Sequence, residues 1–74
     1  MSRPCKLQIN QTGAWRDVVR FDLDGVDEVA LTATASQLVR VADPAGRTTL
    51  RIVVADVFAA PLLRWDREKG WRPW

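Results

Sequence analysis

The sequence contains no histidine, and this absence excludes many kinds of active site. Histidine supplies the base of most nucleophilic triads, the usual general base at neutral pH and the commonest zinc ligand. Cysteine occurs only once, at Cys5, so the chain cannot form an internal disulfide or a zinc site built from several thiolates. We interpret Cys5 as a small apolar residue of a strand rather than as a reactive thiol.

Long hydrophobic runs and clustered glycines are missing as well. No apolar stretch approaches the roughly 20 residues of a membrane span, and the opening MSRPCKLQ has no apolar signal-peptide core. The four glycines are scattered, which excludes a phosphate-cradling loop. We therefore expect a cytoplasmic protein with no membrane partner, no cofactor, no metal and no small-molecule substrate.

The composition that remains is that of an ordinary globular chain. With 74 residues, 47% hydrophobic and 27% charged, it fits one small domain. Residues 1–21 carry four basic residues and one acidic, residues 22–43 one and five, and residues 44–74 six and three. The middle of the chain is thus acidic and its two flanks are basic. The abundance of alanine and arginine is typical of a GC-rich genome, which suggests a bacterial-type protein.

The segment from Asp24 to Ala42 is the only one with a clear helical period. One apolar stripe recurs along it at 100° per residue, with Arg40 on the opposite side. We expect Leu38 to be the central buried residue of this stripe. The stripe comprises Leu31, Ala35, Leu38 and Ala42.

The ends of this helix carry recognisable signals. Asp24 is the expected N-cap, and Asp27, three residues later, can return a hydrogen bond as in a capping box. Pro44 disfavours helical geometry at Asp43 and so ends the helix. We therefore predict a helix over about 25–42.

Four further segments predict strands. Residues 5–10 alternate apolar and polar side chains, and residues 15–22 return after a turn in which Gly13 takes a positive φ. Asp17 breaks the alternation with Trp15, which indicates a bulge or a twisted edge near the turn. Residues 47–54 and 61–65 are the other two strands. The expected fold is α+β: a small ββαββ domain, with a four-stranded, mainly antiparallel sheet and one helix packed on one face.

A single helix covers only one face of such a sheet, so the other face should be open. Arginines interleaved with aliphatic residues on that face fit three uses: a solvated surface, self-association or a platform for another partner. The residues expected there are Lys6, Gln8, Arg16, Val18, Arg20, Arg51, Val53 and either Leu62 or Arg64.

The stretch VVRFDLDGV, residues 18–26, resembles the first motif of the haloacid dehalogenase superfamily. The resemblance implies that Asp22 is a nucleophile towards phosphate and Asp24 a general acid/base, with Mg²⁺ held between them. Enzymes of that family also need a doubly wound sheet, a Ser/Thr, a Lys and a downstream acidic pair, and this chain is too short for such a fold. We therefore interpret Asp22 as a strand-end residue and Asp24 as a helix cap, and we expect no enzymatic activity.

Tryptophan is unexpectedly common in a chain that lacks tyrosine, and three of the four tryptophans fall in the last ten residues. We expect Trp15 and Trp65 to pack in the core or at the end of a barrel. The tail over 66–74 either folds over the sheet or exposes Trp71 and Trp74 as partner anchors.

The function expected from these features is binding. The predicted partner is the protein itself, as a homodimer, or another protein. The contact would use the arginine-bearing sheet face, a strand edge or the tryptophan tail. The alternative is weak binding of single-stranded nucleic acid by the same side chains. The candidate partner-binding residues are Arg16, Arg20, Arg51, Arg64, Trp71, Arg72 and Trp74.

Overall fold

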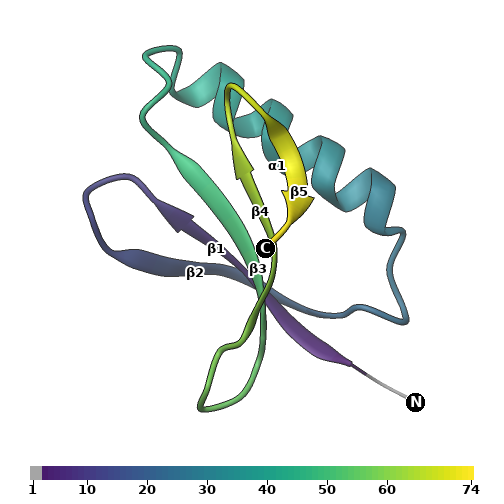
Figure 1. The fold of residues 1–74 in the computed structure, drawn as a ribbon. Helices are drawn as coiled ribbons and strands as arrows, with labels where there is room; N and C mark the ends of the chain where they lie inside the picture. The colour runs from purple at the N-terminus through teal and green to yellow at the C-terminus, as the bar shows by residue number, and fades with distance from the viewer. Residues whose placement is uncertain (1–2) are drawn as a thin grey trace.

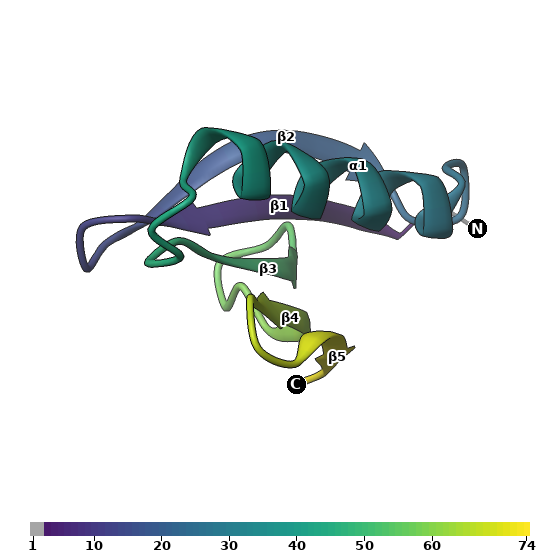
Figure 2. The same ribbon diagram turned by 90° about the horizontal axis from the view of Figure 1, so that it is seen from above.

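The computed structural model, which describes residues 3–74, contains one helix and five strands (Figure 1). The strands form a single antiparallel sheet in the order β2-β1-β3-β4-β5, and α1 lies on one side of it (Figure 2). The α+β class is therefore confirmed, whereas the expected strand number of four is wrong. The elements are β1 (Pro4–Asn10), β2 (Trp15–Asp22), α1 (Glu28–Ala42), β3 (Thr49–Val54), β4 (Pro61–Asp66) and β5 (Gly70–Pro73).

The additional strand is β5, which replaces the tail expected over 66–74. The Asp66 carboxylate accepts hydrogen bonds from the amides of Glu68 and Lys69, and Gly70 has a φ of 70°, so the chain reverses tightly. Trp71 then pairs with Trp65 of β4. Four residues with a tryptophan and a proline show no strand periodicity, and only the contact with β4 makes them a strand.

The β1–β2 hairpin agrees with the sequence prediction, including its irregularity. Gly13 has a φ of 93° in the turn. The pairing shifts between Leu7 and Gln8, so that Leu7 faces Val19 whereas Gln8 faces Asp17. Val18 is the extra residue, which confirms the bulge. Each β2 residue before the bulge therefore faces the side of the sheet opposite to the one that alternation predicts.

The helix begins later than predicted because a turn precedes it. The amide of Gly25 donates to the carbonyl of Asp22 and thereby holds residues 22–25 in that turn. The N-cap is Asp27, whose carboxylate accepts from the amide of Ala30 at 3.1 Å. The prediction of Asp24 as the cap is therefore wrong. The predicted end of the helix at Ala42 is confirmed.

The buried side of α1 also differs from the prediction. Ala35 and Val39 are buried, at 8% and 4% exposure, whereas Leu38 is 63% exposed. The expected central position of Leu38 is wrong because α1 carries apolar residues on both sides. This pattern of apolar residues is compatible with two rotations of α1 about its own axis, and packing against the sheet selects one of them.

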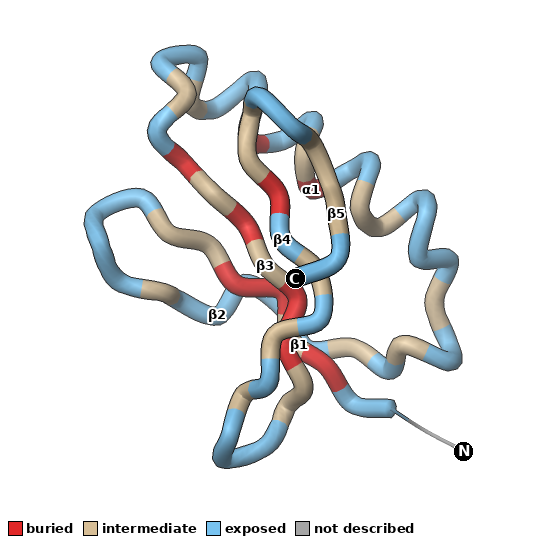
Figure 3. Tube along the Cα trace, viewed as in Figure 1, coloured by how far each residue is buried: buried red, intermediate tan, exposed pale blue. Residues whose placement is uncertain are grey.

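The core lies between α1 and the middle of the sheet, along β1, β3 and β4 (Figure 3). Phe21, Leu63 and Trp71 pack against its edge while remaining partly exposed. Within residues 3–74, no helix has the length and apolar character needed to cross a membrane. The buried core residues are Cys5, Leu7, Ala35, Val39, Leu50, Ile52 and Trp65.

Candidate functional site

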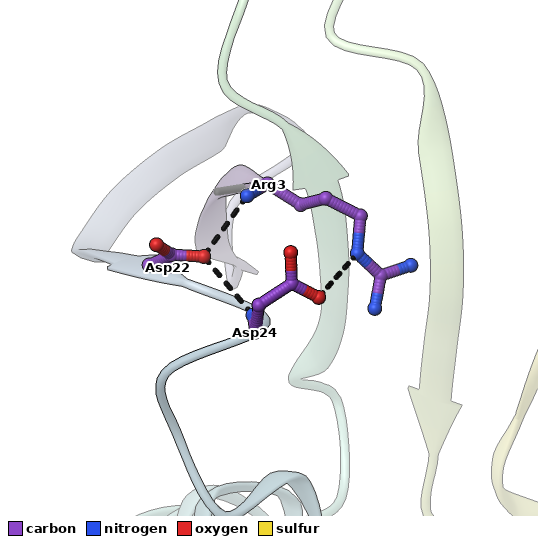
Figure 4. Close-up of polar contacts among 3 residues, drawn as sticks. All are labelled: Arg3, Asp22 and Asp24. Atoms are coloured by element: carbon purple, nitrogen blue, oxygen red, sulfur yellow. Dashed lines mark hydrogen bonds and ion pairs between the residues drawn. The ribbon is translucent and has the colours of Figure 1, made fainter. Parts of the chain in front are cut away.

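Asp22 and Asp24, the two aspartates of the segment that resembles the haloacid dehalogenase motif, stabilise a local turn (Figure 4). The Asp22 carboxylate accepts hydrogen bonds from the amides of Arg3, at 2.9 Å, and Asp24, at 3.0 Å. The Asp24 carboxylate forms an ion pair with Arg3 Nε at 2.8 Å. Arg3 thus contacts both aspartates, and each carboxylate has a structural partner.

The other groups considered for catalysis are possible metal ligands and Cys5. No cluster of three or more His, Cys, Asp or Glu side chains suitable for a metal ion occurs within residues 3–74. Cys5 is buried in the core, and burial raises the pKa of its thiol. A thiol of this kind is a poor nucleophile at neutral pH, in agreement with the apolar role predicted for it.

The side of the sheet opposite α1, which we call the open face, carries the arginines in register. Strand pairing places one residue from each strand in a single row across the sheet. Residues that pair directly share a face of the sheet, so this row projects from the side opposite to Leu7 and Ile52 of the core. From β2 to β5, the row consists of Asp17, Gln8, Arg51, Arg64 and Arg72.

Hydrogen bonds connect the first three members of the row. Arg51 Nε donates to Gln8 Oε1 at 2.7 Å, and Gln8 Nε2 donates to Asp17 Oδ1 at 2.8 Å. The hydrogen bond from Gln8 lowers the pKa of Asp17 below its usual value, with a further contribution from Lys6, whose Nζ lies 3.5 Å away. The Asp17 carboxylate is therefore charged at neutral pH and is already engaged.

Tryptophans from the two edges of the sheet lie beside the arginines. The guanidinium of Arg51 is 4.2 Å from the ring centroid of Trp15, and that of Arg64 is 5.5 Å from the ring of Trp74. Both distances are within the range of cation–π contacts. Trp15 is partly buried and Trp74 is 53% exposed, so indole surface remains accessible.

A hollow of about 190 Å³ opens between these tryptophans. Asp66 at its wall forms an ion pair with Arg72 Nη2 at 2.9 Å, whereas the buried Nε of Arg72 has no hydrogen-bond partner. Amide hydrogen bonds, first that of Lys69, and the charge of Arg72 lower the pKa of Asp66. The hollow is lined by Trp15, Thr49, Leu50, Arg64, Trp65, Asp66, Arg72 and Trp74.

The structure places the candidate residues named from the sequence on two different sides of the sheet. Arg20, which pairs with Lys6, lies on the open face with Arg51, Arg64, Arg72 and Trp74. Two candidates lie on the helix side instead.

Arg16 lies on the helix side because the bulge at Val18 pairs it with Ile9. Trp71 lies there because it pairs with Trp65, and its Nε1 donates to the carbonyl of Thr32 in α1 at 2.8 Å. Val53 pairs with Lys6 and so lies on the side of the open face as expected, but it is fully buried and unavailable to a partner.

The sequence prediction missed a second surface, the outward side of α1. Leu38 is 63% exposed and Val41 71% exposed, and both lie on a broad, shallow and mainly apolar surface of α1. The charge pattern of α1 could have indicated this surface, since Glu28 and Arg40 are the only charged residues of the helix. We call this surface the outer α1 face: Ala33, Thr34, Gln37, Leu38 and Val41.

Comparison with known proteins gives no family assignment. The sequence matches no protein-family model, and no curated protein or solved structure matches it at a significant level.

Proposed function

We propose that this is a non-enzymatic interaction protein that forms a homodimer through the outer α1 face. The observation that carries the proposal is an exposed helix side with no charged residue. A surface helix normally presents charged and polar residues to water, whereas a helix that is apolar on both sides is normally buried. A second protein surface packed on the outer α1 face would account for Leu38 and Val41.

The distribution of large and small side chains along the outer α1 face supports a second copy of the chain as the protein that packs there. The larger apolar residues, Leu38 and Val41, lie in the C-terminal half of the outer α1 face, and the small residues Ala33 and Thr34 lie in its N-terminal half. A two-fold axis through the middle of the helix brings the C-terminal half of one copy against the N-terminal half of the other. Each Leu38 then packs between the small residues of its partner, and no like charges meet.

The C-terminal tryptophans Trp71 and Trp74 are weaker candidates for this contact. Trp71 packs against the edge of the core, and the ring of Trp74 contacts Arg64 of the same chain. The cytoplasmic location, the bacterial origin and the absence of catalysis remain predictions from the sequence.

Light scattering over a range of concentrations tests the dimer. We expect a mass near twice the 8.4 kDa of the chain. Leu38→Lys should return the protein to monomer because it places an unpaired charge in the interface. The matched control is Val57→Lys, which changes an 89% exposed valine in the β3–β4 connection, a segment that lies away from α1 (Figure 1). This control should remain a dimer.

A charge-pair experiment tests the antiparallel arrangement. Thr34→Glu alone should also be monomeric. A mixture of Leu38→Lys with Thr34→Glu should form a heterodimer, because the introduced ammonium and carboxylate groups then face each other across the interface. Circular dichroism should show that each variant is folded. A monomeric native protein would overturn the proposal, and so would a dimer that Leu38→Lys leaves intact.

A further inference from the structure

We propose that the open face binds single-stranded nucleic acid, with bases stacked on Trp15 and Trp74 and phosphates bound by Arg64 and Arg72. The proposal does not depend on the dimer, since the outer α1 face lies on the other side of the sheet (Figure 2). It rests on the charges of the open face, on its aromatic rings and on the hollow between them.

The charges of the open face leave several cations available for phosphate. Lys6, Arg20, Arg51, Arg64 and Arg72 project there, against the three carboxylates Asp17, Asp22 and Asp66, of which Asp22 accepts hydrogen bonds from the amides of Arg3 and Asp24. Asp17 is engaged by Gln8 and Lys6, and Asp66 by Arg72 and two backbone amides. Within residues 3–74, Arg51 and Arg64 have no carboxylate partner.

The side chain of Arg72 lies at the hollow and has donors beyond its contact with Asp66. Its Nη2 contacts Asp66, but its buried Nε has no hydrogen-bond partner, and Arg72 lines the hollow. The guanidinium is partly exposed and carries further N–H groups, so it can donate to a phosphate oxygen while it keeps its contact with Asp66. Arg64 lines the same hollow, so one phosphate can contact both guanidinium groups.

The aromatic rings favour a nucleic acid over an acidic peptide. A peptide carboxylate would pair with arginine without needing an indole ring. Trp15 and Trp74 instead border the hollow from opposite edges of the sheet, and each already lies against a guanidinium on one side. A base on the accessible side of either ring would extend this stack.

The size of the hollow favours an extended chain over an enclosed small molecule. Its volume of about 190 Å³ is below the roughly 300–1,000 Å³ of typical ligand pockets. A strand that crosses the sheet, with one group in the hollow and its neighbours on the flanking rings, fits the row of arginines. Two or three phosphates would be neutralised, so the affinity should be modest and should depend on salt.

Fluorescence anisotropy with labelled oligothymidine and oligouridine of about 12 nucleotides tests the proposal on the full chain. We expect saturable binding of at least one of them, weaker binding of duplex DNA, and a slope of log affinity against log salt near about −2. Comparing the two oligonucleotides distinguishes DNA from RNA as the natural ligand.

Three variants assign the binding to the open face. Arg64→Gln and Trp74→Leu should each weaken binding by roughly 5-fold to 150-fold, which corresponds to about 1–3 kcal/mol. The matched control is Arg40→Gln, which removes the same charge from α1 on the other side of the sheet and should change affinity by less than about threefold.

Competition with an oligoglutamate of equal charge identifies the class of ligand. If oligoglutamate binds as tightly and Trp74→Leu has no effect, the open face binds acidic peptides and the proposal is wrong. Equal losses in Arg40→Gln and Arg64→Gln would show unspecific charge attraction and would also overturn it, as would the absence of any binding at millimolar protein.

Discussion

Leu38 and Val39 follow each other in α1, yet their side chains lie in opposite environments. Val39 contacts the core at 4% exposure, and Leu38 faces outward at 63% exposure. Both residues are aliphatic, and both favour burial to a similar degree. The difference arises because the sheet presents a surface that accepts the side of α1 with Ala35 and Val39.

The same substitution at two valines of α1 measures this difference. Val39→Ala should lower the free energy of unfolding by about 1–3 kcal/mol, because it removes two buried methyl groups and leaves a cavity. Val29→Ala, at a position that is 77% exposed, should change it by about 0.5 kcal/mol or less. Urea denaturation gives both values. Similar losses at the two positions would mean that α1 is rotated relative to this structure.

The connection from α1 to β3 shows how one residue can organise an element boundary. Asp43 ends the helix, and its carboxylate accepts hydrogen bonds from the hydroxyl and amide of Thr48, at 2.6 and 2.9 Å, and from the amide of Arg47. Arg67 Nη2 donates to the Asp43 carbonyl at 2.7 Å and so joins the β4–β5 turn to the same point. The hydrogen bond from the Thr48 side chain is the main cause that lowers the pKa of Asp43.

This lowered pKa predicts a pH dependence of stability. A carboxyl whose folded pKa is depressed stabilises the protein above its ordinary pKa near 4 and loses that contribution as pH falls through the folded value. Asp43→Asn should therefore be less stable than the native protein at pH 7, and the difference should shrink as pH decreases below about 4. Thermal denaturation from pH 7 to pH 2 measures it.

Thr48→Val provides the control, since it removes the hydroxyl donor and keeps the charge. It should raise the pKa of Asp43 towards the ordinary range in an NMR titration. A difference between Asp43→Asn and the native protein that stays constant with pH would contradict this account.

At the scale of the whole molecule, the sheet separates two unlike surfaces. α1 covers one side and turns an uncharged face outward, and the open face carries a row of arginines flanked by tryptophans. A chain of 74 residues buries little surface, so every strand matters to its stability. β5 is short, but it packs Trp71 against the edge of the core and adds a hydrogen bond to α1.

Truncation measures the contribution of β5. A chain that ends at Lys69 loses the packing of the partly buried Trp71, its hydrogen bond to α1 and the pairing of β5 with β4, so the loss should approach the value of about 3–5 kcal/mol that is typical of a fully buried tryptophan. We expect this chain to be largely unfolded at 37 °C by circular dichroism, because small domains have little stability to spare. A chain that ends at Pro73 loses only Trp74 and should stay within about 1 kcal/mol of the full chain. A folded chain ending at Lys69 would show that residues 70–74 form a dispensable tail.

The sequence by itself determined the local structure of most of this chain. Alternation identified β1 and β2, the bulge near Asp17 followed from its break, and Pro44 marked the end of α1. These features depend on neighbouring residues and on the conformations that single residues prefer, so local sequence is sufficient to predict them. Reasoning from local sequence also identified Arg51, Arg64 and Arg72 as candidate partner-binding residues.

Only the tertiary structure decided the rest. The rotation of α1, the strand nature of residues 70–73 and the side on which Arg16 and Trp71 lie all depend on contacts between distant segments. A helix with apolar residues on both sides has two amphipathic rotations of similar quality, and a one-residue bulge reverses every side chain beyond it. The outer α1 face was missed for this reason, because packing against the sheet selects which apolar stripe stays in water.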